Sequence, residues 1–145
     1  WAADFDSWEV CDQACGNLFA HTPLAYAKSL EWSARPEAFV KRAGFVLMAD
    51  LAHRDQKTSN AALLAFLPVI EREAGDGRNF VKKAVNWALR DIGKRNLVLN
   101  VDAIAVADRL RQRPEPAARW NGGDAWRELT SEAVQARLAE RAARE

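Results

Sequence analysis

The sequence Phe39-Val40-Lys41-Arg42-Ala43 recurs almost residue for residue as Phe80-Val81-Lys82-Lys83-Ala84, 41 positions further along the chain. A weaker third copy is Ala125-Trp126-Arg127-Glu128-Leu129, which follows Ala88-Leu89-Arg90-Asp91-Ile92 at an offset of 37. Periods of about 40 residues with two helices each are typical of HEAT and armadillo repeats, whose stacked helical pairs bury one another's apolar faces. We therefore expect an all-α fold, a right-handed α-solenoid of HEAT-like antiparallel helical pairs. The alternative is a coincidental likeness between two amphipathic helices.

The composition agrees with a folded domain. Of 145 residues, 49% are hydrophobic and 28% are charged, so we expect a single repeat domain over residues 1–145. A run of about eighteen apolar residues is absent from the sequence, which argues against a membrane span. The net charge of +1 by itself indicates no partner. The chain begins at Trp1 rather than Met, and we expect it to be an N-terminally truncated piece of a longer protein.

The cysteines and histidines argue against a disulfide or a metal centre. Cys11 and Cys15 lie four residues apart, which is a poor spacing for a disulfide within one helix. With His21 and His53 as the two histidines of the chain and no further thiol, we expect no zinc site. Reduced cysteines are typical of the cytoplasm, and we expect a cytoplasmic protein.

Capping residues, prolines and apolar spacing predict eight helices joined by short loops. The first six are expected over about residues 6–19, 22–33, 37–53, 59–74, 78–95 and 102–113. The last two are expected to follow Pro116 and Ser131. Pro68 should kink or break the fourth helix, because proline removes a backbone hydrogen bond.

Charge is distributed unevenly along the chain. Residues 1–20 carry four acidic side chains and no basic one, whereas residues 77–95 carry six basic side chains against one aspartate. The bases of the two repeat copies, Lys41-Arg42 and Lys82-Lys83, occupy matching positions, so they would form a basic stripe suited to a phosphate backbone. The alternative is a solvated helix face with ordinary ion pairs between neighbouring turns.

Six tryptophans are many for a chain of this length. Three lie at apolar helical positions and are expected in the core: Trp32, Trp120 and Trp126. Trp8 precedes Asp12 by one helical turn, and Trp87 follows the bases of the second repeat copy. An indole beside a carboxylate on a basic wall suits a flat, cationic or sugar-like ligand. For Trp8 and Trp87, too, a partly buried core tryptophan is the alternative.

This sequence resembles DNA alkylation repair proteins of the AlkD-like HEAT-repeat family in four stretches that occur in the family's order. They are Phe5-Asp6-Ser7-Trp8-Glu9-Val10-Cys11-Asp12, Phe39-Val40-Lys41-Arg42-Ala43, Arg78-Asn79-Phe80-Val81-Lys82-Lys83-Ala84-Val85-Asn86-Trp87-Ala88-Leu89-Arg90 and Ala117-Ala118-Arg119-Trp120. The most specific segment is FVKKAVNWALRDIGKRN, from Phe80 to Asn96. The resemblance spans about residues 5–138, and the chain looks like roughly the C-terminal two-thirds of a family member.

The resemblance implies a DNA glycosylase that hydrolyses the N-glycosidic bond of N3- and N7-alkylated purines in duplex DNA. The family's catalytic cleft uses two tryptophans, an aspartate and an arginine, which correspond to Trp8, Trp87, Asp12 and Arg42. A set of basic residues would contact DNA phosphates: Lys41, Lys82, Lys83, Arg90, Lys94 and Arg95. No cofactor or metal is implied, and a protein that scans DNA along an open groove is expected to act as a monomer. With DNA as its partner, we expect it to be associated with the nucleoid.

The implied chemistry suits these residue types. An N-alkylated purine already carries positive charge and leaves readily, so the barrier is the developing oxocarbenium ion of the sugar. Asp12 would stabilise that charge and orient the attacking water, while Trp8 and Trp87 pack on the lesioned nucleotide. Members of the family do not need the enclosed base-flipping pocket of other glycosylases, which suits the open surface of a solenoid.

The chain departs from the family at two places. Many members carry a small residue where this chain has Asn86, so we expect the amide to tighten the cleft or alter the choice of lesion. Asn121-Gly122-Gly123 interrupts a helix that members usually continue, and we expect it to loosen that helix locally. Two other functions stay open at this point: a catalytically silent solenoid that binds DNA structures, and a protein–protein scaffold.

Overall fold

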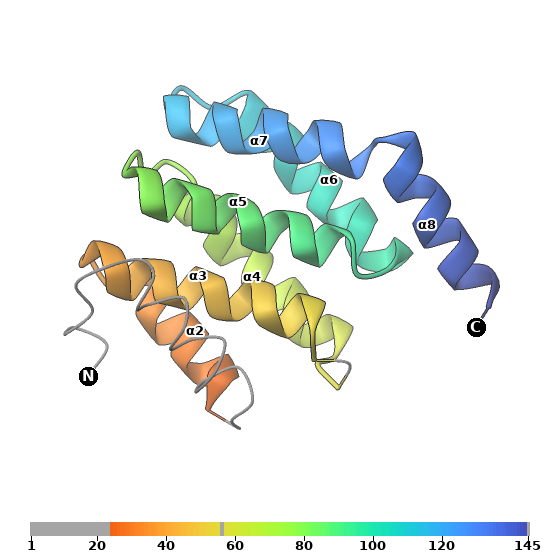
Figure 1. Ribbon diagram of the computed structural model, residues 1–145. Helices are drawn as coiled ribbons and strands as arrows, with labels where there is room; N and C mark the ends of the chain where they lie inside the picture. Colours follow the sequence, from red (N-terminus) through yellow and green to blue (C-terminus); the bar gives the residue numbers. More distant parts are fainter. Residues whose placement is uncertain (1–23, 56, 145) are drawn as a thin grey trace.

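The computed structural model describes residues 24–55 and 57–144 of the chain. These residues form seven α-helices and no strand (Figure 1). The helices are α2 (Ala25–Ser33), α3 (Ala38–His53), α4 (Asn60–Glu73), α5 (Asn79–Gly93), α6 (Leu97–Arg111), α7 (Pro116–Leu129) and α8 (Glu132–Ala143). The helix expected near residues 6–19, with both cysteines, lies outside the described residues. None of the described helices is long and apolar enough to cross a membrane.

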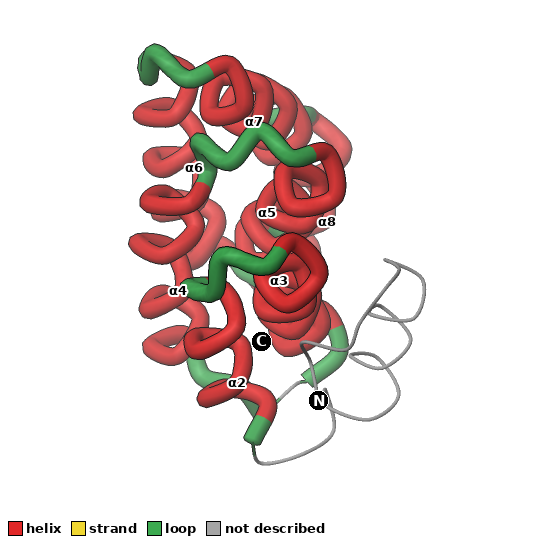
Figure 2. The backbone as a smooth tube through the Cα atoms, turned by 90° about the vertical axis from the view of Figure 1, so that its left-hand side faces the viewer, coloured by secondary structure: helices red, strands yellow, loops and turns green. Residues whose placement is uncertain are grey.

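The helices stack in two layers, which confirms the expected α-solenoid. Helices α2, α4 and α6 form the first layer, and α3, α5 and α7 form the second (Figure 2). Each pair of consecutive helices, α2–α3, α4–α5 and α6–α7, contributes one helix to each layer. Helix α8 contacts α6 and α7 at the C-terminal end of the stack. Because each pair lies against the next, the apolar faces of neighbouring pairs share one continuous core.

The two copies of the repeated sequence meet across the contact between α3 and α5. The rings of Phe39 and Phe80 lie 5.9 Å apart. Val40 and Val81, the next residue in each copy, are both buried. The helices are therefore packed in register, and the residues that follow each copy are carried along neighbouring helices side by side (Figure 1).

Side-chain caps begin three helices. Ser59 accepts a hydrogen bond from the backbone at the start of α4, and Ser131 does the same for α8. Asn96 caps α6, because its side-chain oxygen accepts a 3.0 Å hydrogen bond from the backbone N–H of Leu99. The expectation that this helix begins at Asp102 is therefore wrong, since Asn96 supplies a cap earlier in the chain.

The break expected at Pro68 does not occur. Helix α4 continues from Asn60 to Glu73 with the proline inside it. Pro68 lies on the exposed side of the helix, where water can bond the carbonyl oxygen that proline leaves without a partner. The missing hydrogen bond therefore costs less here than it would on the buried side.

The glycines do not interrupt α7, and one of them lets this helix approach α6 closely. The helix continues through Asn121-Gly122-Gly123, contrary to expectation. A Cβ atom on Gly122 would lie 2.5 Å from the backbone nitrogen of Arg111 and 2.6 Å from the carbonyl oxygen of Ala107, both on α6. The absent side chain thus allows α7 to lie directly against α6.

A glycine, Gly44, likewise allows α2 to lie directly against α3. A Cβ atom on Gly44 would lie 2.4 Å from the backbone nitrogen of Ser33 and 2.8 Å from its Cα. Both atoms belong to the backbone at the end of α2, which has no rotamer through which to move away. The spacing of the first helical pair therefore depends on glycine at this position.

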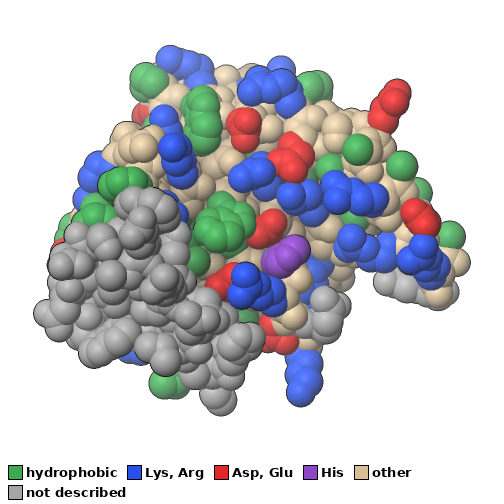
Figure 3. Space-filling model, in the orientation of Figure 1, with side chains coloured by type: hydrophobic (Ala, Val, Ile, Leu, Met, Phe, Trp, Pro, Cys, Tyr) green, Lys and Arg blue, Asp and Glu red, His purple; other side chains and the backbone are tan. Residues whose placement is uncertain are grey.

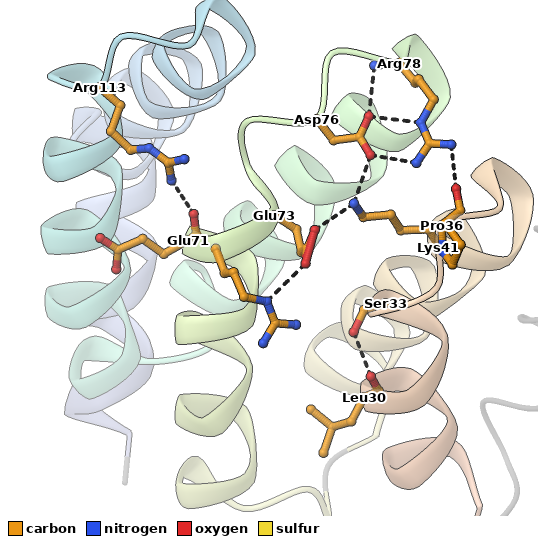
Figure 4. Close-up of polar contacts among 10 residues, drawn as sticks. Leu30, Ser33, Pro36, Lys41, Glu71, Glu73, Asp76, Arg78 and Arg113 are labelled. Carbon is orange, nitrogen blue, oxygen red and sulfur yellow. Dashed lines mark hydrogen bonds and ion pairs between the residues drawn. The ribbon is translucent and has the colours of Figure 1, made fainter.

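Lys41 is buried and fastens the α4–α5 loop to α3 (Figure 4). Its Nζ lies 2.7 Å from Glu73 Oε1 and 2.9 Å from Asp76 Oδ2. Arg78 holds the same Asp76 through its guanidinium and donates a further 2.7 Å hydrogen bond to the carbonyl of Pro36. The Arg78 hydrogen bond, with that of Lys41, outweighs burial and lowers the pKa of Asp76 far below its ordinary value.

Replacing Gly44 by alanine should lower the free energy of unfolding by about 1–3 kcal/mol, because the new methyl group meets fixed backbone. Urea titration measures this change. Gly77→Ala is the matched control, since no atom lies within 4 Å of a Cβ there, and its effect should be below about 1 kcal/mol. Equal effects of the two substitutions would contradict the close α2–α3 contact.

Acid should destabilise the protein through Asp76. A carboxyl whose pKa is lowered by folding stabilises the folded state above its unfolded pKa of about 4, and that stability is lost as the pH falls below it. Asp76→Asn should cost about 1–3 kcal/mol at pH 7 and should reduce the stability lost between about pH 5 and pH 2. Urea titrations of both proteins across this pH range test it. Parallel pH profiles would show that Asp76 does not carry the effect.

Candidate nucleic-acid interface

An open hollow is lined by residues of α3, α5 and α7. Its volume is about 400 Å³, and we call it the tryptophan hollow. The residues that line it are Arg42 from α3, Lys83, Asn86, Trp87 and Arg90 from α5, and Trp120 and Asp124 from α7. The α5 residues recur at intervals of three and four, which places them on one face of the helix. This lining combines two flat indoles with more cations than carboxylates.

Arg42 reaches the hollow from the neighbouring repeat. It is only 7% exposed, and its Nη1 donates a 2.6 Å hydrogen bond to the backbone carbonyl of Phe80 in the first turn of α5. The structure thus brings Arg42 and Trp87 into one hollow, although they lie far apart in the sequence. The other two residues of the predicted catalytic set, Trp8 and Asp12, lie outside the described residues.

Trp120 lines the hollow and is 39% exposed, so the expectation that it belongs to the core is wrong. The ammonium of Lys82 lies 4.7 Å from the centroid of its ring, which is a cation–π contact between α5 and α7. An offset of 37 gives Trp120 the repeat position of Lys83, whose side chain is exposed. The other two expected core tryptophans do pack there, because Trp32 is buried and Trp126 lies against the core.

Asp124 is a carboxylate of the hollow that our sequence analysis missed. Its Oδ2 lies 3.9 Å from Arg90 Nε, and its side chain is partly exposed. The signal was present in the third repeat copy, since an offset of 37 gives Asp124 the repeat position of Trp87. Extending that copy by one residue toward the N-terminus predicts that both residues face the same way.

Ion pairs with α7 occupy two of the predicted phosphate-binding cations. Arg90 Nη1 and Lys94 Nζ each lie 2.9 Å from a carboxylate oxygen of Glu128. Burial raises the pKa of Glu128, but the hydrogen bonds and charges of Arg90 and Lys94 together bring it below its ordinary value. Arg90 also donates a 2.7 Å hydrogen bond from Nε to Asn86 Oδ1. The positive charge of α5 is therefore partly neutralised on this side.

A second, larger hollow opens at the C-terminal ends of α3 and α5, against α8. Its volume is about 740 Å³, and we call it the basic cleft. Its charged and titratable lining residues are His53, Lys57, Asp91, Lys94, Arg95, Arg137 and Arg141. On the same face, lysine and arginine side chains form a band that runs from α5 and α7 toward α8 (Figure 3). The cleft therefore presents a strongly positive surface.

Two arginines of the cleft bond to backbone oxygens. Arg95 donates from Nη1 to the carbonyl of Ala52 at 2.8 Å and from Nη2 to that of Thr58 at 2.7 Å. Arg141 Nη1 donates a 2.7 Å hydrogen bond to the carbonyl of Arg95. These bonds satisfy carbonyl groups at the end of α3 and just after α5. Because a carbonyl carries no net charge, they leave the positive charge of the cleft in place.

Asp91 is the single carboxylate that lines the basic cleft in the described part of the chain. Burial raises the pKa of Asp91 above its ordinary value, although Lys94 and His53 nearby favour the ionised form. Across residues 24–55 and 57–144, no group of three or more His, Cys, Asp or Glu side chains is placed to hold a metal ion. A nearby histidine and one carboxylate are too few for a structural zinc site.

The predicted phosphate-binding residues separate into groups. Four of them line one of the two hollows: Lys83, Arg90, Lys94 and Arg95. Lys82 covers the ring of Trp120, whereas Lys41 lines neither hollow because Glu73 and Asp76 hold it. Lys41 and Lys82 occupy the same position in the two copies of the repeated sequence but differ in their contacts. Lys41 on α3 is held by acidic residues at the end of α4 and in the α4–α5 loop, whereas Lys82 on α5 lies over an indole ring.

Comparison with known proteins identifies the family. Neither the curated proteins nor the solved structures include a significant match to this chain. The model of the family described as DNA alkylation repair enzyme matches residues 1–139. This match includes both copies of the repeated sequence and every residue that lines the tryptophan hollow. The protein is therefore a member of the DNA alkylation repair enzyme family.

Proposed function

We propose that this protein is a DNA glycosylase of the AlkD-like type, which hydrolyses the N-glycosidic bond of N3- and N7-alkylated purines in duplex DNA. Membership of the DNA alkylation repair enzyme family supports a role in repair. The observation that carries the proposal is the tryptophan hollow itself. It joins Arg42 and Trp87, two of the four residues predicted for catalysis, with further cations and a second indole.

In this proposal the carboxylate of Asp12 acts on the sugar. Loss of the cationic base leaves an oxocarbenium-like sugar, and a fixed carboxylate beside the anomeric carbon stabilises it. The same carboxylate orients the water that completes hydrolysis. Trp8 and Trp87 pack on the lesioned nucleotide, and Arg42, held by the Phe80 carbonyl, supports its phosphate.

The exposure of Trp120 argues for a site that stays open to solvent. Its ring forms part of the wall of the hollow and remains 39% exposed. An N-alkylated purine does not require an enclosed pocket to become a better leaving group, because its positive charge already weakens the glycosidic bond. An open hollow can therefore accept a nucleotide that remains attached to a long duplex.

The basic cleft would bind the DNA backbone on one side of the lesion. Lys83 in the tryptophan hollow lies on α5, and Lys94 in the basic cleft is the C-cap residue of the same helix, eleven positions further on and on the same face. At ~1.5 Å per residue they are about 16 Å apart along the helix, close to half a turn of B-form DNA. One duplex bound as partner to a single protein molecule can therefore contact both hollows.

Asp12→Asn should abolish release of 7-methylguanine from alkylated duplex DNA, by at least about 100-fold, because the amide cannot stabilise the oxocarbenium ion. Binding to the same DNA should change little. Asp102→Asn is the matched control, since Asp102 lies exposed on α6 in the first layer. Quantifying the released base by chromatography gives the rates.

Three outcomes would contradict this mechanism. Full activity in Asp12→Asn would exclude Asp12 as the catalytic carboxylate, and loss of activity in Asp124→Asn alone would transfer that role to the carboxylate of the hollow. DNA binding by the wild-type protein without any base release would instead support a catalytically silent DNA-binding solenoid.

Lys57→Glu combined with Arg137→Glu should weaken binding to duplex DNA and flatten its salt dependence, because both side chains line the basic cleft. Each lost phosphate contact lowers the slope of log K against log salt by about 0.9. Fluorescence anisotropy across a salt series measures this slope. Lys28→Glu on α2, in the first layer, also replaces a positive charge by a negative one, and it should leave the slope unaltered. An unchanged slope in the double variant would exclude the cleft from the DNA contact.

A further inference from the structure

Asn86 is a buried amide in the wall of the tryptophan hollow. It is 2% exposed, and the residues before and after it on the buried side of α5, Val85 and Ala88, are apolar and fully buried. An amide in such surroundings costs free energy unless its donors and its acceptor find partners. Each polar atom of the Asn86 amide is therefore expected to have a hydrogen-bond partner.

Arg90 fixes the orientation of this amide. The guanidinium Nε can only donate, so the atom of Asn86 that faces it at 2.7 Å must be the oxygen. Rotating the amide by 180° would place its NH2 group against another N–H donor. Arg90 is itself held by Glu128 at 2.9 Å, so the orientation does not depend on a mobile side chain.

The amide nitrogen is then left without an acceptor. Asn86 Nδ2 is buried and has no hydrogen-bond partner among the described residues. Asn86 is one of the residues that line the tryptophan hollow, so a ligand that binds there can bring an acceptor to this side chain. The residue thus carries a binding capacity that the free protein does not use.

We propose that Asn86 Nδ2 donates a hydrogen bond to a non-bridging oxygen of a DNA phosphate in the tryptophan hollow. Lys83 and Arg42 line the same hollow, and an anionic oxygen is the acceptor that can satisfy an amide donor and these cations together. A base edge is the competing acceptor. The inference rests on the proposed function only in requiring DNA in this hollow, so it is tested by binding rather than by base release.

Asn121 supplies an internal control. It is fully buried on α7, and neither of its side-chain polar atoms has a partner among the described residues. It does not line the tryptophan hollow or the basic cleft. The same substitution at Asn121 and at Asn86 therefore removes a buried, incompletely bonded amide in both cases, but removes a group that lines a binding surface only at Asn86.

The first measurement is the dissociation constant of the full 145-residue chain for a duplex that carries a stable abasic-site analogue, which cannot be turned over. Asn86→Ala should weaken binding about tenfold, the effect of one lost hydrogen bond to a charged group. Asn121→Ala should weaken it less than twofold. Asn86→Asp keeps an oxygen for Arg90 but replaces the donor with a negative acceptor, and it should weaken binding more than Asn86→Ala does.

The second measurement locates the acceptor. Single phosphates around the abasic site are replaced in turn by neutral methylphosphonates. At the phosphate that Asn86 contacts, the loss caused by Asn86→Ala should disappear, whereas at every other phosphate the two losses should add. Additive losses at all positions would overturn the phosphate contact in favour of a base-edge contact.

The remaining outcomes are also decisive. Equal losses in Asn86→Ala and Asn121→Ala, or unchanged binding in Asn86→Asp, would overturn the inference and assign Asn86 to packing alone. Absence of DNA binding by the wild-type chain would overturn it as well. Normal binding by Asn86→Ala together with active base release by the wild type would reject this contact while leaving the glycosylase proposal intact.

Discussion

The contact between α3 and α5 sets the arrangement of everything around it. The two copies of one sequence pack against each other in register, with Phe39 beside Phe80 and a buried valine after each. This register brings the Arg42 guanidinium to the carbonyl of Phe80. It thereby places a cation of one repeat next to the tryptophan of the following repeat. The geometry of the hollow is a direct result of how the two copies stack.

Local signals in the sequence predicted most of the helices, because caps and repeats depend on neighbouring residues. Ser59 and Ser131 begin helices as expected. Two of the errors arose where a distant part of the chain decides the outcome. Gly122 depends on the backbone of α6, and Lys41 on the acidic loop after α4. Such partners become visible only once the helices are assembled.

The residues of the candidate site could be predicted where they belong to the repeated sequence or lie close to it. Arg42 and Trp87 follow from the repeated sequence and the family resemblance, and they share a hollow. Asp124 and the exposed Trp120 lie just before the weak third copy of the repeated sequence. Extending the offset of 37 to these two residues would have placed both on the surface of the hollow. The pairing of Arg90 and Lys94 with Glu128 could not be inferred, because it joins helices from different repeats.

The arginines at the basic cleft have a mechanical consequence. Arg95 connects the last turn of α3, the loop after it and the end of α5, and Arg141 connects that same end to α8. Bending the stack so that these helix ends separate would break several of these hydrogen bonds at once. The two guanidinium groups therefore help the packed core to hold the helix ends together at this edge. The spacing of the charges offered to a bound polyanion is consequently as rigid as the stack itself.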